Sequence, residues 1–205
     1  MCGFEFRQCH RFLHILSLTQ NGPKVNEKML IAFDYSMTSP SMTIYSKDHY
    51  KSFVVSSEKK IQPYETSLFS FFPIMYPLWN TPQERYELIS DALMARIPEA
   101  SSYEFGIESY SMGSKGRVFD IAEATQMIKY KVWKKYGKEM HLFSPATVKK
   151  EFHGKGNAKK EQMAEAFHDR FGFNVHDVVV SKIRGSASDL VDSIAVNVCL
   201  QNKSV

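Results

Sequence analysis

Four acidic side chains have types and a spacing that suit the binding of divalent metal ions. Asp34 and Glu108 each end an apolar segment that predicts a buried strand, and such strand ends line the crevice where open α/β sheets bind ligands. Asp189 and Asp192 lie three residues apart in a segment that predicts a helix, so both project from one face. Four carboxylates in one place would repel one another unless cations were bound. Because oxygen ligands select hard ions, the set predicts a site for two Mg²⁺ ions, with Mn²⁺ able to substitute.

Two ions in such a site would activate a water and stabilise the leaving 3′ oxygen of a phosphodiester, which is the chemistry of a two-metal nuclease. Each acid also has a simpler explanation. An acid at a strand end is more often solvated than bound to a metal, and Asp189 could instead interact with the dipole of its helix. The positions of all four acids within the order of the elements favour the metal site.

The elements that must position these acids follow an α/β order. Three apolar segments before residue 60 predict an antiparallel meander, and alternating helices and strands after residue 80 predict a parallel continuation. The expected fold class is therefore α/β, with a mixed sheet of an antiparallel meander followed by parallel strands, flanked by helices. The expected strands are 29–36, 41–46, 51–57, 103–109 and 139–143, and the expected helices are 82–97, 117–136, a short helix from 145, a helix capped by Asn157 and closed by Gly172, and 188–200.

Two segments fall outside this regular pattern. Residues 1–28 predict an N-terminal extension, with Met29 as a candidate natural start, and residues 29–205 predict a single domain. Residues 60–80 contain three prolines among many aromatic residues, and proline at that density argues against a regular element. We therefore expect residues 60–80 to form an ordered, aromatic-rich insertion in the domain.

Composition excludes several classes of protein. The 205 residues are 43% hydrophobic, which is enough for a buried core and excludes disorder throughout. No run approaches the ~18 apolar residues of a membrane span, so no membrane partner is expected. The three cysteines are scattered without CxxC spacing. They indicate neither a disulfide framework nor a zinc site, and they suit a reducing compartment.

Positive charge is concentrated between residues 115 and 160. This segment holds twelve basic residues against four acidic ones, a balance of +8 in a chain whose net charge is +4. Such a surface beside an acidic metal centre suits the binding of nucleic-acid phosphates. For Lys129–Lys138, a simply solvated helix face is an equally good explanation. The candidate DNA contacts in the segment are Lys115, Arg117, Lys149, Lys150, Lys155 and Lys159.

Two glycine motifs resemble binding loops but lack the context for them. Gly154-Lys155-Gly156 does not follow a strand and lacks the GxxxxGK[ST] spacing, so no nucleotide cofactor is expected. Residues 113–116 match the GXXG loop of RNA-binding KH modules, but the surrounding elements do not. We interpret residues 113–116 as a basic loop after Glu108 that touches DNA.

The sequence resembles the RuvC-type Holliday junction resolvases, which belong to the RNase H-like nuclease superfamily. The resemblance spans about residues 29–200 and is most specific in its last two stretches. These contain the PxxVK…GxGxAxK pattern and the D-x-x-D-x-[apolar]-A step. The matching stretches are IAFDYSMTSPSMTIYS, FGIES, FSPATVKKEFHGKGNAKKEQMAEAF and ASDLVDSIAVNV.

This resemblance implies an RNase H-like fold in which the four acids bind the metals. It further implies that Lys149 and Lys160 lie near the scissile phosphate, with Lys160 as a catalytic residue. The chain departs from the family after the first acid, where a tyrosine and a serine replace the usual Pro-Gly or similar. Tyr110 is the nearest candidate for the aromatic residue that the family uses on the bases of the junction.

The expected function is a structure-selective endodeoxyribonuclease that cuts four-way DNA junctions in recombination and repair and leaves 5′-phosphate ends. Paired cuts need two active sites, so the resemblance implies a homodimer, through the helix at 117–136 or the insertion at 60–80. It also implies the cytoplasm of a bacterial cell or of a phage-infected host, with mitochondrial targeting by residues 1–28 left open. Two alternatives are a related nuclease that acts on flaps or RNA–DNA hybrids, and a junction-binding protein that does not cleave.

Overall fold

The computed structural model describes residues 27–57, 61–110, 118–179 and 184–203. Most of the predicted N-terminal extension lies outside these residues, as do Arg117 and the predicted basic loop at 113–116 with Lys115. None of the helices in the described segments combines the length and the hydropathy of a membrane span.

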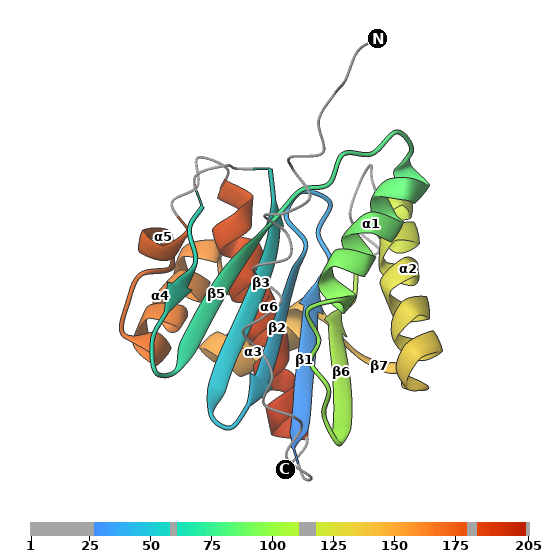
Figure 1. Ribbon diagram of the computed structural model, residues 1–205. Coiled ribbons are helices and arrows are strands. Elements are labelled where there is room, and N and C mark those ends of the chain that lie inside the picture. Colours follow the sequence, from blue (N-terminus) through green and yellow to red (C-terminus); the bar gives the residue numbers. More distant parts are fainter. Residues whose placement is uncertain (1–26, 58–60, 111–117, 180–183, 204–205) are drawn as a thin grey trace.

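A mixed sheet of seven strands, in the order β4-β5-β3-β2-β1-β6-β7, forms the centre of the described part (Figure 1). Strands β1, β2 and β3 pair antiparallel, as the predicted meander requires. Strands β6 and β7 then continue the sheet in parallel beside β1. The strands are β1 (Lys28–Asp34), β2 (Ser41–Ser46), β3 (His49–Ser56), β4 (Tyr64–Glu65), β5 (Phe69–Met75), β6 (Ser102–Glu108) and β7 (Met140–Phe143).

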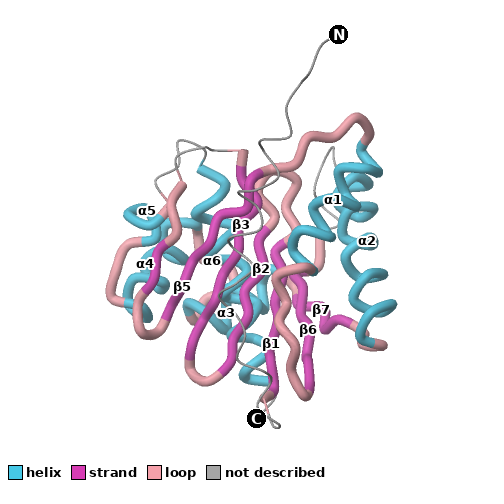
Figure 2. The backbone as a smooth tube through the Cα atoms, in the orientation of Figure 1, coloured by secondary structure: helices cyan, strands magenta, loops and turns pink. Residues whose placement is uncertain are grey.

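The prediction of an irregular insertion at 60–80 is wrong for its central part, which forms β4 and β5. Strand β5 pairs in parallel with β3, and the register places Pro73 opposite Val54. The short β4 pairs with β5 only at Phe71 and Ser70. Beyond that point the outer side of β5 has no strand partner among the described residues, so a residue without an N–H is tolerated there. The tube in Figure 2 shows β4 and β5 extending the sheet on the side away from β6.

Six helices in the described part cover the two faces of the sheet. The predicted cap of the fourth helix is wrong: that helix begins at Lys160 with Lys159 as its N-cap, whose backbone N–H donates to Gln162 Oε1 at 2.9 Å. Asn157 lies two residues before this N-cap. The helices are α1 (Pro82–Met94), α2 (Val118–Tyr136), α3 (Pro145–His153), α4 (Lys160–Phe171), α5 (Val175–Val178) and α6 (Arg184–Lys203).

Two hydrophobic cores lie on opposite faces of the sheet. On one face, α1 and α2 bury Ile89, Leu93 and Ile128 against the sheet. On the other face, α3, α4 and α5 pack around α6, which crosses β1, β2 and β6. This close approach depends on Gly106 in β6, because a Cβ there would lie 2.8 Å from Leu200 Cγ. Helix α6 is therefore held at a fixed depth against the strands that end in Asp34 and Glu108.

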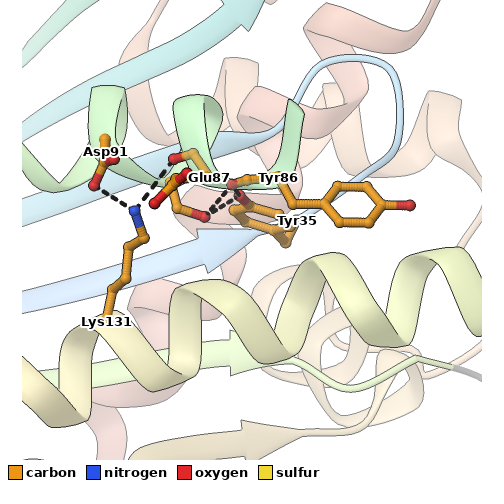
Figure 3. A network of polar contacts seen from close by, with 6 residues as sticks. Tyr35, Tyr86, Glu87, Asp91 and Lys131 are labelled. Carbon is orange, nitrogen blue, oxygen red and sulfur yellow. Dashed lines mark hydrogen bonds and ion pairs between the residues drawn. The ribbon is translucent and has the colours of Figure 1, made fainter. Parts of the chain in front are cut away.

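A polar network connects β1 to α1 and α2 beside the first acid (Figure 3). The buried hydroxyl of Tyr35 lies 2.6 Å from Ser90 Oγ on α1. Lys131 on α2 donates to Asp91 Oδ1 at 2.5 Å and to the Glu87 carbonyl at 3.4 Å. The Tyr35–Ser90 contact thus anchors the backbone that follows Asp34 to α1, whereas Lys131 joins α1 to α2 only.

Candidate metal centre

The four predicted acids come from three elements that meet at one edge of the sheet. Asp34 is the last residue of β1 and Glu108 the last of β6, and the parallel register pairs Phe33 with Ile107 immediately before them. Asp189 and Asp192 lie near the start of α6. Ligand atoms of Asp34, Asp189 and Asp192 all lie within 4.8 Å of one another.

Glu108 does not belong to this group within 4.8 Å, but it is close enough to act on it electrostatically. Its negative charge contributes to the raised pKa of Asp34, and the charges of Asp192 and Asp189 contribute to its own raised pKa. The structure therefore brings three predicted acids into direct proximity and places the fourth beside them.

Helix α6 presents its two acids because the rest of its first turns is anchored in the core. Leu190, Val191 and Ile194 are buried among strands and helices. Asp189 itself is 8% exposed, while Asp192 is half-buried. Because they lie three positions apart, the two carboxylates emerge on one face of the helix, as the spacing predicted.

Three serines fix the position of Asp189, and sequence reasoning missed them. The hydroxyls of Ser36 and Ser39 both donate to Asp189 Oδ2, the first at 2.7 Å, and the hydroxyl of Ser41 donates to the backbone carbonyl of the same residue. Gly185 on α6 allows the loop that carries Ser36 and Ser39 to come close, since a Cβ on Gly185 would lie 3.2 Å from Ser39 Oγ. The signal in the sequence was the density of hydroxyl residues directly after the first acid, SMTSPS.

All four acids are raised in pKa in the metal-free protein. Burial raises the pKa of Asp34 well above its usual range, and repulsion from the other acids adds to it. Burial, then repulsion from Asp192, raises the pKa of Glu108 to about 7. Burial and the charge of Asp189 raise the pKa of Asp192 to about 6. The pKa of Asp189 is raised by burial, with the Ser39 and Ser36 hydroxyls opposing that rise.

Two of the predicted lysines act on this cluster. The charge of Lys160, the first residue of α4, opposes the rise in pKa of all three aspartates, and Lys149 on α3 does the same for Glu108 and Asp192. These two cations do not offset burial and mutual repulsion, since all four pKa values remain raised.

The other described candidates lie away from the acids. Lys150, Lys155 and Lys159 are exposed, and none of the described shifts in carboxylate pKa arises from them. Tyr110 is 44% exposed and follows β6 two residues after Glu108. These side chains are accessible to a macromolecular ligand without belonging to the cluster.

The residues fit a hard divalent cation. The clustered donors are carboxylate oxygens, the ligand type that Mg²⁺ and Mn²⁺ prefer. Burial first, and then mutual repulsion, raises the pKa values of these acids, and a bound cation would favour their charged forms. The cluster sits at the carboxyl ends of parallel strands, where open α/β sheets bind ligands.

The strand order, the antiparallel meander and the crossing helix α6 define an RNase H-like fold, which confirms the predicted fold class. Among solved structures, the chain is similar to Thermus thermophilus RuvC in complex with Holliday junction substrate. The TM-score is 0.54 and the identity 14%, over 86% of this chain and 94% of that chain. A second Thermus thermophilus RuvC structure gives a TM-score of 0.49 at 16% identity, over 83% of this chain and 91% of that chain. No protein-family model matches the sequence, and no curated protein matches it.

Proposed function

We propose that this protein is a RuvC-type, metal-dependent endonuclease that hydrolyses phosphodiesters in four-way DNA junctions. The observation that carries the proposal is the convergence of Asp34, Asp189 and Asp192 within 4.8 Å at the edge of an RNase H-like sheet, with Glu108 alongside. Solvated acids at strand ends avoid mutual repulsion, whereas these acids are clustered and their pKa values are raised by burial and repulsion.

The four acids would hold two Mg²⁺ ions, and Asp34 is the acid on which the charges of all three others act. When bound, the ions would supply a water of lowered pKa and stabilise the charge on the leaving 3′ oxygen, so that products carry 5′-phosphates. Ser36 and Ser39 keep Asp189 Oδ2 occupied. Partial burial of the cluster strengthens the charge interactions in it.

Lys149 and Lys160 would neutralise the phosphate that enters the site. Both lie on the helices that border the acids, and both already lower carboxylate pKa values there. Exposed lysines on the same helices and on the loop between them extend the positive surface along which a DNA backbone would run.

Lys160→Ala is expected to reduce the rate of junction cleavage about 10- to 100-fold, because one charge-assisted contact to a phosphate is worth roughly 1.5–3 kcal/mol. The measurement is single-turnover cleavage of a labelled junction at saturating protein. Lys159→Ala is the matched control: this neighbouring lysine is an exposed candidate DNA contact that does not contribute to the pKa shifts of the acids, and saturating protein offsets any loss of binding. An equal decrease in cleavage rate in both variants would contradict a specific role for Lys160.

The substrate class is tested with a synthetic four-way junction, incubated with EDTA, Mg²⁺ or Mn²⁺ beside matched duplex, flap and RNA–DNA hybrid substrates. Symmetric nicks in the junction that need a divalent ion support the proposal. Preferential cutting of flaps or hybrids would assign the protein to a related nuclease class. Tight binding of the junction without nicking under either ion would show that the protein is a junction-binding protein that does not cleave.

Paired cuts need two sites, and we propose that α2 forms the interface of a homodimer. Its outward face exposes Phe119, Tyr130 and Trp133, with exposed fractions of 81%, 49% and 57%. Large apolar side chains gathered on one face of a helix are typical of an interface between subunits.

Trp133→Glu is expected to convert the dimer to a monomer at micromolar concentration, because burial of a charge at an apolar interface costs several kcal/mol. Sedimentation velocity of parent and variant measures the change. Lys135→Glu, which alters the charge of the same helix at an exposed position, should leave the mass unchanged. A parent protein that is monomeric would contradict the proposed dimer directly.

A further inference from the structure

Arg85 on α1 is a buried cation whose described contacts include no carboxylate. It is 8% exposed, and no ion pair joins it to an acidic residue within the described part of the chain. Its guanidinium lies over the rings of Tyr76, Trp79 and Tyr86, at 5.4, 5.8 and 5.9 Å from their centroids. Burial of a charge in this way is costly unless its N–H groups are bound, so the position needs an explanation.

The terminal N–H groups of the guanidinium face the loop that follows Asp34. One terminal nitrogen donates to the backbone carbonyl of Met37, the other lies 3.9 Å from the sulfur of the same residue, and Nε donates to the hydroxyl of Tyr76. Met37 is thereby held from α1, across 48 positions of sequence. Lysine has no planar fork and could not satisfy both oxygen partners in this geometry.

The loop that Arg85 holds is the loop that holds Asp189. Met37 lies between Ser36 and Ser39, whose hydroxyls both donate to Asp189 Oδ2. Ser36 also accepts from the backbone N–H of Ser39 at 3.1 Å, which closes the loop on itself. Among the described residues no hydrogen bond reaches the other carboxylate oxygen, Oδ1.

We infer that Arg85 is a positioning residue of the metal centre: it fixes the loop at 36–39 so that two serine hydroxyls occupy Asp189 Oδ2 and turn Oδ1 toward a divalent cation. This inference rests on the proposed function for its metal, but it concerns a residue on the opposite helical layer from α6. Residues that orient metal ligands through hydrogen bonds typically affect metal affinity by about 10- to 100-fold when they are removed.

The test is the binding of Mn²⁺ to DNA-free protein, followed by the electron paramagnetic resonance signal of the free ion. Arg85→Met, which keeps most of the side-chain volume, should weaken Mn²⁺ binding about 10-fold or more. Arg85→Lys keeps the charge but loses the fork, and should also bind Mn²⁺ more weakly than the parent. The matched control is Lys131→Met, which breaks the nearby α1–α2 ion pair with Asp91 and should lower thermal stability without altering Mn²⁺ affinity.

A double-mutant cycle separates positioning from general destabilisation. The cycle compares Mn²⁺ affinity in Arg85→Met, in Ser36→Ala/Ser39→Ala and in the variant that combines them. If Arg85 acts through the serines, the combined variant will lose less Mn²⁺ affinity than the product of the two separate losses. Independent, multiplicative losses would overturn the inference, as would equal Mn²⁺ affinities in Arg85→Met and Lys131→Met. Circular dichroism establishes folding, and Arg85→Lys provides the comparison if Arg85→Met does not fold. A parent that binds Mn²⁺ but cuts no junction would contradict the proposed function and leave this inference standing.

Discussion

The Asp34→Asn variant is expected to bind a four-way junction but to cut it at least about 1,000-fold more slowly than the parent, a loss of ~4 kcal/mol in transition-state stabilisation. Asparagine keeps the size of the side chain and one oxygen, but it removes the charge that all three other acids act on. An ion at the site would lose one of its carboxylate ligands, and the remaining acids of the described cluster would already serve as its other ligands.

The same substitution should stabilise the metal-free protein, which separates lost chemistry from lost folding. Burial and repulsion disfavour the charged form of Asp34, so its pKa lies well above its usual range. A neutral amide avoids that repulsion, and the melting temperature in EDTA should rise or stay constant while activity disappears. Asp177→Asn, at an exposed position on α5, is the matched control and should change neither property. If Asp34→Asn cuts junctions as fast as the parent, the proposed metal site is wrong.

Much of the fold was predictable because its main strands and helices have unambiguous patterns. The apolar run that ends at Asp34 suits a buried central strand, and β1 is paired on both sides. The acids of α6 converge with Asp34 because three-residue spacing on a helix and a strand end at the same sheet edge leave little freedom. Local pattern and global topology agree at this place, as expected of a foldable sequence.

The parts that were missed depend on tertiary context. Pro73 argued against a strand, yet it is accommodated on the open outer side of β5, a circumstance that no local pattern reveals. Ser36 and Ser39 look like ordinary turn residues until α6 brings Asp189 to them across about 150 positions of sequence. Arg85 looks like one more charge on an amphipathic helix, and only the packing of α1 against the loop shows that it is buried.

Removal of divalent ions at neutral pH is expected to destabilise the protein strongly, and acidification is expected to restore stability. Burial and repulsion raise the pKa of Glu108 from its ordinary 4.5 to about 7 and that of Asp192 from 3.8 to about 6. Between those limits the folded protein holds protons that the unfolded chain has released, so the free energy of unfolding decreases as pH rises. The stability contributed by these protonated acids is fully present below their ordinary pKa values, near pH 4, and is lost by about pH 7.

The expected size comes from the shift of a single group. For Glu108 alone, a rise from 4.5 to about 7 corresponds to ~3 kcal/mol of lost stability between acid and neutral pH. Bound Mg²⁺ reverses the loss, since it binds the folded state and adds stability that grows with the logarithm of its concentration. Urea unfolding at pH 5 and pH 8, in EDTA and in Mg²⁺, measures both effects.

Glu108→Gln is the matched control for this pH dependence. It removes a group that titrates between the two pH values, so its stability in EDTA should change less from pH 5 to pH 8 than that of the parent. Most proteins behave in the opposite way, because their acids are paired and stability is lost as pH falls. A parent whose metal-free stability rises from pH 5 to pH 8 would mean that the four acids are not buried together without a cation. The same acids would then be free of the repulsion that makes a divalent ion necessary.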